Sequence, residues 1–246
     1  MEVHHHAHTA RKKWTHYFWE FLMLFLAVFC GFLAEYQLEH TIEKGREKQY
    51  MTSLLEDLQI DTAMLQNEFE LGAQQKIIAD SLVEVINNQP LTSDNIQKIY
   101  ILSANSTRVV STTFESRTSS QLKNSGAMRL VRKKLVSDSI LKYWQYVEAC
   151  NGIGDRLDFI AEARGHLYAR LFHNKYLIRE DSLLSPVSSI KEGASFISND
   201  PALLAEYSNR TYARKWTLNN YLTFMKWTRD RAARLMEIIR KEYHLK

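Results

Sequence analysis

The chain has 246 residues, with 32 Lys and Arg against 28 Asp and Glu, and a formal net charge of +4. This mild charge excludes the strongly basic class of nucleic-acid-binding proteins. The 8 glycines and 3 prolines are few for a turn-rich β protein, so the composition favours helices.

The first element is an apolar segment from Trp14 to Ala34. Residues 21–34 carry no charge, and the whole segment would be about 31 Å long as a helix, close to the ~30 Å hydrocarbon core of a bilayer. Amphipathic aromatic rings, which prefer the headgroup region, flank both ends: Trp14, Tyr17, Trp19 and Tyr36. We therefore predict that residues 14–35 form one transmembrane helix in a lipid bilayer.

The topology of this helix follows from its flanks. Arg11, Lys12 and Lys13 precede it, whereas the first charges after it are acidic, beginning with Glu35. The positive-inside rule puts residues 1–13 in the cytoplasm and residues 36–246 across the membrane, in the periplasm of a bacterium. A cleaved signal peptide fits poorly, because cleavage after Ala34 would put Phe32 where small residues are wanted. We expect an uncleaved signal anchor in the inner membrane.

One narrow stripe of this helix combines an acid with small residues: Glu20, Leu24, Ala27, Gly31 and Ala34. Small residues let another helix backbone approach closely, and an acid within a span usually faces protein or water. We predict that the stripe binds a membrane helix of another copy of the chain or of another protein. The alternatives are that Glu20 snorkels to the cytoplasmic interface or that it carries protons or ions.

The basic N-terminal tail contains a short histidine tract: His4, His5, His6 and His8. Imidazole suits zinc, nickel and copper, so the tract is the only metal candidate in the tail. A short flexible tract that binds metal only adventitiously is the better interpretation, and we assign no metal site to it.

Beyond Tyr36 the helix is expected to continue, as one long helix or two stacked ones. Apolar residues recur at three- and four-residue spacing, with Gly45 and Gly72 as weak points, and Asp57 and Asp61 are expected on the opposite, charged face. The pattern stops at residues 87–90, which include Pro90.

Shorter elements follow. A helix is predicted over residues 94–104, then a Ser/Thr-rich loop whose residues 107–114 could form a short extended piece. The next helix is predicted over residues 114–124, capped by Thr112 or Thr113 and stopped by Ser125 and Gly126. A basic cluster comes after it and is either a solvated turn or a contact for anionic headgroups or an acidic partner: Arg129, Arg132, Lys133 and Lys134.

Two long helices complete the chain. The first begins at Asp138, bends or breaks at residues 151–154, and ends near Tyr176. After a loop over residues 181–194, Asp200 and Pro201 start a last helix that runs nearly to the chain end. The predicted fold class is therefore all-α: one N-terminal transmembrane helix continuing into an extracytoplasmic antiparallel helical bundle with long helices.

The sequence lacks the common catalytic motifs. No phosphate-binding glycine loop, zinc motif or nucleophile elbow is present. The nearest constellation is one helix face with Asp158, Glu162 and His166, followed by His173, and it lacks a matching helix for a metal pair. We interpret it as a solvated face and expect no catalytic residue and no cofactor. If Cys30 lies in the span, Cys150 is either buried and inert or pairs between chains.

Two stretches resemble a known family. They are the histidine tract with Lys12 to Glu35, and residues 122–130 around Ser125 and Gly126. They are similar to a family of uncharacterised bacterial single-span membrane proteins with a histidine-rich N-terminus and a domain of unknown function. The resemblance implies the single-span topology and a histidine tract that belongs to the natural sequence. It implies no activity.

The predicted function is a non-enzymatic, membrane-anchored interaction or scaffold protein. It would assemble with itself or with another membrane protein through the transmembrane stripe, without nucleic acid. The alternative is an extracytoplasmic helical bundle that senses a ligand between its helices and signals through a partner. A polar pocket between the long helices would favour this alternative, and a solid apolar core would not.

Overall fold

The structure, a computed structural model, describes residues 14–178 and 186–245. The histidine tract and the basic residues before the span lie outside these residues, so the predictions on them stay predictions. Residue contacts divide the chain into two units, Met1–Gln49 and Tyr50–Lys246. The predicted domain boundaries, 1–13, 14–35 and 36–246, also stay predictions.

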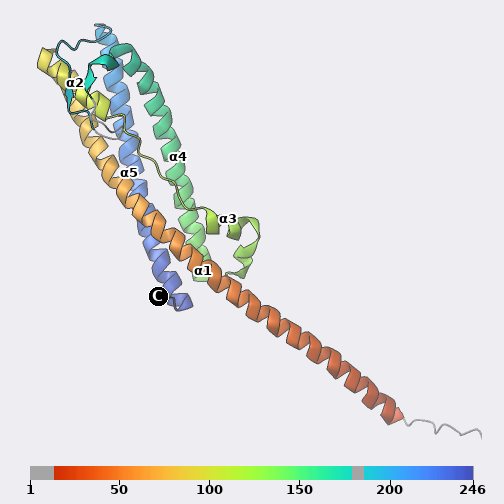
Figure 1. The fold of residues 1–246 in the computed structure, drawn as a ribbon. Helices are drawn as coiled ribbons and strands as arrows, with labels where there is room; N and C mark the ends of the chain where they lie inside the picture. The colour runs from red at the N-terminus through yellow and green to blue at the C-terminus, as the bar shows by residue number, and fades with distance from the viewer. Residues whose placement is uncertain (1–13, 179–185, 246) are drawn as a thin grey trace, which may run out of the picture. The chain divides into compact units, whose positions relative to one another are not determined.

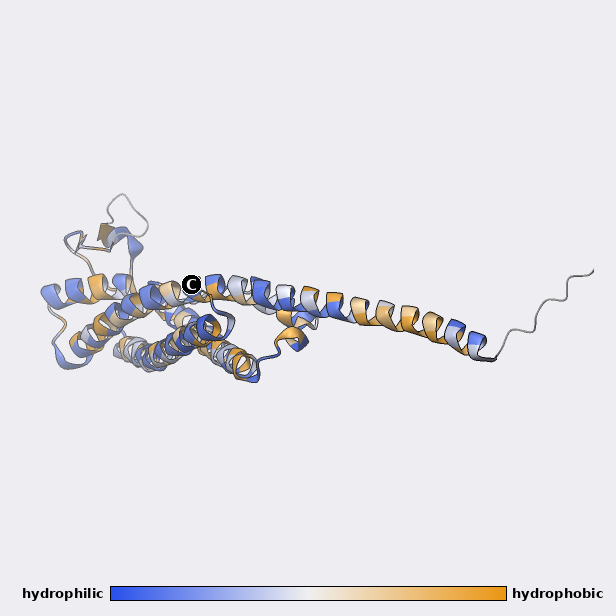
Figure 2. Ribbon diagram, turned by 90° about the horizontal axis from the view of Figure 1, so that it is seen from below, coloured by the Kyte–Doolittle hydropathy of each residue, from blue (hydrophilic) through white to orange (hydrophobic). Residues whose placement is uncertain are grey.

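Helix α1 runs without a break from Trp14 to Asn88. Its first part is the apolar segment, whose large side chains are exposed, and Figure 2 shows the apolar residues concentrated there. This segment is long and apolar enough to cross a membrane. Neither Gly45 nor Gly72 interrupts the helix, which corrects their prediction as weak points. A Cβ added at Gly72 would lie 2.5 Å from Cδ2 of Leu222, so the glycine permits a close approach of side chains instead.

Three short helical elements follow α1. Helix α2, Ser93–Asn105, is capped by Thr92, whose side chain accepts a hydrogen bond from the Asn95 N–H. Helix α3, Arg117–Asn124, ends before Gly126, which has φ 66° in the left-handed region that favours glycine. The 3-10 helix η1, Ala127–Leu130, comes next. The predicted stop at Ser125 and Gly126 is therefore confirmed.

The predicted start of α3 is wrong. The helix begins at Arg117 and not at Phe114, and neither Thr112 nor Thr113 is its cap. The reason is that the backbone N–H groups of Glu115 and Thr118 donate to the carboxylates of Asp61 and Asp57 on α1. These contacts hold the preceding segment against α1 in a non-helical conformation.

Helix α4, Lys134–Leu171, starts four residues earlier than predicted and ends before Phe172. It passes through residues 151–154 without a break. Gly154 has a packing role there, because a Cβ at this position would lie 3.0 Å from the Tyr221 hydroxyl. After α4 come the 3-10 helix η2, Asn174–Tyr176, and strand β1, Leu177–Ile178.

The only strands in the described residues are β1 and β2, Ser189–Ile190, which pair antiparallel. Part of the predicted loop over residues 181–194 is therefore a strand, and part lies outside the described residues. Residues 107–114 form no strand. Helix α5, Pro201–Tyr243, is capped by Asp200, which accepts from the Ala202 N–H at 2.9 Å. The predicted start of this helix is confirmed.

Three apolar clusters fill the unit Tyr50–Lys246, and each draws residues from α1, α4 and α5, the three long helices that lie side by side in Figure 1. The first cluster contains Leu58 of α1, Ile140 of α4 and Leu235 of α5. The middle cluster contains Leu65, Leu157 and Leu222 of the same three helices. The last cluster contains Leu82, Leu167 and Leu204. Residue numbers thus rise along α1 and α4 and fall along α5. Helix α2 joins the last cluster through Ile99 and Tyr100.

Candidate functional site

The stripe predicted to bind a membrane helix has all five of its members exposed: Glu20, Leu24, Ala27, Gly31 and Ala34. A Cβ added at Gly31 would meet nothing within 4 Å. The Glu20 carboxylate lies 3.0 Å from Nε2 of His16, one turn earlier. On the other side of the helix, the rings of Phe21, Phe25 and Phe29 stack in series. The small residues and the stacked aromatic rings therefore lie on different sides of one regular helix.

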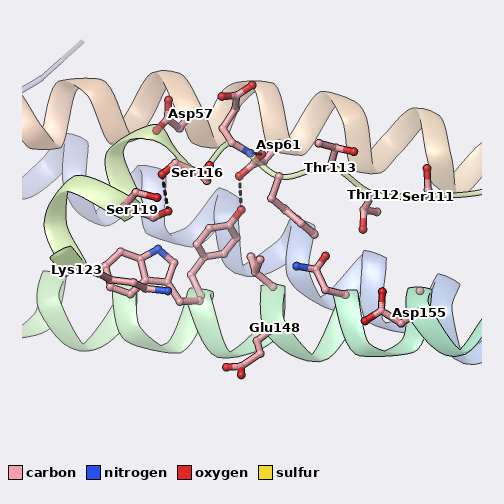
Figure 3. Close-up of a pocket in the computed structure, with 18 of the residues that line it drawn as sticks. Asp57, Asp61, Ser111, Thr112, Thr113, Ser116, Ser119, Lys123, Glu148 and Asp155 are labelled. Carbon is pink, nitrogen blue, oxygen red and sulfur yellow. Dashed lines mark hydrogen bonds between the residues drawn. The ribbon is translucent and has the colours of Figure 1, made fainter.

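A cleft of about 830 Å³ lies within the unit Tyr50–Lys246. Its walls come from α1, α3, α4, α5 and the extended residues 111–116, and Figure 3 shows residues 111–116 passing between α1 and α4. The lining is mixed, with polar and charged side chains beside the rings of Phe114, Tyr143, Trp144 and Tyr221. The volume falls in the usual range for small-molecule sites, about 300–1,000 Å³.

Asp57 forms part of the cleft lining from α1 and is 2 % exposed. One of its oxygens accepts from the Arg117 guanidinium at 2.7 Å, and the other accepts from the Thr118 N–H at 3.0 Å. Arg117 itself is exposed, and this ion pair raises its pKa. Asp57 therefore has a structural role: it holds the first turn of α3 against α1.

Asp61, one turn further along α1, is also 2 % exposed. Its Oδ1 accepts from the Glu115 N–H at 2.8 Å, and its Oδ2 accepts from the Tyr143 hydroxyl at 2.6 Å. Burial raises the pKa of Asp61, and the two hydrogen bonds oppose that shift. The pKa of Tyr143 is raised as well, by burial and by the neighbouring carboxylate. Because both oxygens of Asp61 are engaged, this carboxyl is a fixed part of the wall.

Tyr221 lies at another wall of the cleft. Its hydroxyl accepts from the Thr112 N–H at 3.0 Å and lies 2.8 Å from the Thr112 Oγ1. Burial raises the pKa of Tyr221 to about 12, so the ring stays neutral at physiological pH. The neighbouring Cys150 is buried, as predicted, and burial raises the pKa of its thiol to about 11. Residues 111–116 are thus tied to α5 through Thr112 and to α1 through Glu115.

The charge of the cleft is predominantly negative. Six acidic residues line it and one basic residue, Lys123, whose ammonium lies 4.5 Å from the centroid of the Trp144 ring. Asp57 and Asp61 are engaged by the chain itself, whereas Asp155 and Asp158 are exposed on α4. In Figure 3 the Asp155 carboxylate lies on the side of α4 that faces α1, and that of Glu148 lies on the opposite side. The open side of the cleft therefore favours a positively charged group.

The polar face predicted on α4 is only partly in this cleft. Asp158 lines it, whereas Glu162 and His166 are exposed elsewhere on α4 and His173 is half-buried after its end. No group of three or more potential metal ligands occurs among residues 14–178 and 186–245. Within the basic cluster, Lys133 pairs with Glu242 at 3.1 Å, so this lysine ties the start of α4 to the end of α5.

Asp57 and Asp61 are both buried, which corrects their predicted position on the charged face of the helix. The position of Asp61 could have been found from the sequence. Asp61 shares one helical stripe with Leu54, Leu58 and Leu65, and this spacing was the signal that could have placed it on the buried face. Residues 111–116 could not have been found in this way, because the positions that hold them lie far away in the sequence.

No protein-family model, curated protein or solved structure matches this chain. The cleft and the transmembrane stripe are therefore the observations from which function has to be inferred.

Proposed function

We propose that this protein is a membrane-anchored ligand-binding protein. Residues 14–35 would hold it in the bacterial inner membrane, with residues 36–246 in the periplasm as a helical bundle. The cleft between α1, α3, α4 and residues 111–116 would bind a small, positively charged organic ligand, and a membrane partner would receive the signal. The single observation that carries this proposal is the acid-lined cleft of about 830 Å³ with aromatic walls.

The architecture supports a bundle, with one difference from the predicted arrangement. The order of residues in the three apolar clusters supports α5 running antiparallel to α1 and α4. It also supports α1 and α4 running in the same direction, so the bundle would be only partly antiparallel. Two parallel helices need a long connection, which α2, α3 and the segment between them supply.

The chemistry of the cleft supports a cationic ligand and no reaction. Exposed carboxylates of Asp155 and Asp158 can pair with an ammonium group, while the Tyr143 and Trp144 rings offer an apolar surface to its hydrocarbon part. The buried Asp57 and Asp61 have both oxygens occupied by the chain's own donors. We therefore propose a non-enzymatic binding site.

Calorimetric titration of the full chain in mild detergent would test the ligand class. Phenethylamine, a small aromatic cation, is expected to bind, whereas the matched anion 3-phenylpropionate is not. Asp155→Asn and Asp158→Asn should each weaken phenethylamine binding roughly 2–5-fold, as expected for one exposed charge contact. Asp138→Asn, on the same helix but outside the cleft, is the control. Equal binding of the two probes, or equal binding by all variants, would rule out this site.

The transmembrane stripe supports a second candidate function, which is contact with a membrane partner. Its exposure along one face, with small residues at Ala27, Gly31 and Ala34, supports association with another copy or another membrane protein. Crosslinking in membranes should give a discrete adduct that Gly31→Leu abolishes and Phe29→Leu, on the opposite face, preserves. A strictly monomeric protein without a crosslinked partner would contradict this role.

A further inference from the structure

A pair of buried arginines lies outside the cleft. Arg164 on α4 and Arg214 on α5 are each 3 % exposed. Neither forms an ion pair with a carboxylate among the residues that the structure describes. Arginine is rarely buried without a charged partner, because removing an isolated cation from water is very unfavourable.

The hydrogen bonds of both guanidinium groups go to neutral acceptors. Arg164 donates to the Ser106 Oγ at 2.7 Å, to the Ser106 carbonyl at 3.0 Å and to the Tyr207 hydroxyl at 3.2 Å. Arg214 donates to the Arg108 carbonyl at 3.1 Å. Nε of Arg164 and Nη1 of Arg214 are buried without any acceptor among the described residues. One donor nitrogen on each guanidinium is thus left unused.

The two cations also act on each other. Burial, together with the charge of Arg164, lowers the pKa of Arg214 to about 10, and the charge of the Asp158 carboxylate opposes this shift only in part. A guanidinium with this pKa is still protonated at neutral pH, so the pair does not relieve its repulsion by losing a proton. The two positive charges are therefore both present in the interior.

The position of the pair suggests how it would be used. Along α4, Arg164 lies between Leu157 of the middle apolar cluster and Leu167 of the last one. Along α5, Arg214 lies between Tyr207 and Leu218 of the same two clusters. The arginines and Ser106 therefore form a polar layer between two apolar clusters, where α4, α5 and the end of α2 meet.

We propose that Arg164 and Arg214 form a binding site for a small free oxyanion, such as phosphate, sulfate or a simple carboxylate. The planar forks of two guanidinium groups match the oxygens of such an ion, and the unused Nε and Nη1 donors would be satisfied by it. The ion would neutralise the layer and join α4 to α5. Neither arginine lines the cleft, so this inference does not depend on the ligand proposed for it, although the charge of Asp158, which does line the cleft, acts on Arg214.

The test is thermal unfolding of the full chain in neutral detergent at fixed ionic strength, in chloride with increasing sodium phosphate, sulfate or formate. A site that binds only the folded state should raise the melting temperature with the logarithm of the oxyanion concentration once this exceeds the dissociation constant, by roughly 5–10 °C at about 100 times the dissociation constant. Equilibrium dialysis with labelled phosphate should give one ion per chain. Oxyanions that act no differently from chloride would overturn the proposal.

Variants would show whether the two arginines cause the rise in melting temperature. Arg164→Gln and Arg214→Gln should each abolish the logarithmic rise in melting temperature, and Arg→Lys at either position should reduce it, because a point charge lacks the fork. Arg156→Gln and Arg210→Gln, exposed on the same two helices, should retain it. If a Gln variant does not fold, the wild-type titration and the Lys variants decide the question. A logarithmic rise that persists in both folded Gln variants would overturn the site.

Discussion

The unit Tyr50–Lys246 buries two pairs of charged residues in opposite ways. Asp57 and Asp61 have a donor for every carboxylate oxygen, two of them backbone N–H groups of the chain around α3. Arg164 and Arg214 find only neutral acceptors and leave one nitrogen each unpaired. A satisfied buried charge fixes a segment of the fold, whereas an unsatisfied pair of like charges marks a place that suits an additional ligand.

Removal of a satisfied charge should have the largest effect. Asp61→Ala would leave the buried Tyr143 hydroxyl and the Glu115 N–H without an acceptor, so we expect a loss of about 3 kcal/mol in the free energy of unfolding. Urea denaturation of the full chain in mild detergent, followed by tryptophan fluorescence, would measure it. Asp138→Ala, at an exposed position of α4, should change stability by less than about 0.5 kcal/mol. Similar values for the two variants would contradict the structural role of Asp61.

A smaller loss of stability is expected when only one hydrogen-bond donor to Asp61 is removed. Tyr143→Phe takes the hydroxyl from Asp61 but keeps the ring packed, and the Glu115 N–H remains as a donor. We expect about 1–2 kcal/mol less stability in the same denaturation assay. The double variant with Asp61→Ala should lose less than the sum of the two single losses, because the residues share one hydrogen bond. Additive losses would show that the bond does not couple them.

Removal of a buried arginine should not lower the stability of the protein, in contrast to removal of Asp61. In chloride buffer without oxyanions, Arg214→Met removes one of two like charges and a single hydrogen bond, while its side chain can still pack in the interior. We expect stability to be unchanged or raised by about 1 kcal/mol. A loss of more than about 2 kcal/mol would mean that Arg214 is already compensated in the free protein, and the contrast with Asp61 would disappear.

The difference between these pairs also shows what the sequence could predict. The cap at Asp200, the stop at Gly126 and the long helices follow from local patterns, and the structure has them. The start of α3 does not follow from a local pattern, because it depends on hydrogen bonds that Asp57 and Asp61 accept, and these residues lie far earlier in the chain. Spacing could have placed Asp61, Arg164 and Arg214 on apolar helix faces. Which groups would satisfy them depends on tertiary contacts that spacing does not reveal.

The pH dependence of stability gives the smallest and most specific test of the acid pair. Burial raises the pKa of Asp61 above 3.8 in the folded protein, so the folded state holds its proton more tightly than the unfolded chain does. The contribution of this carboxyl to the free energy of unfolding is fully present below about pH 3.8 and is lost as pH rises through the raised pKa. Asp61→Asn does not titrate, so the stability of the wild type relative to this variant should fall as pH rises from about 3.8 and then level off. Paired urea denaturations across this range would measure the difference, with Asp138→Asn as the control that shows no such fall. A relative stability that rises with pH would mean that the hydrogen bonds from Tyr143 and Glu115 outweigh burial, so that Asp61 would stabilise the fold as an ion.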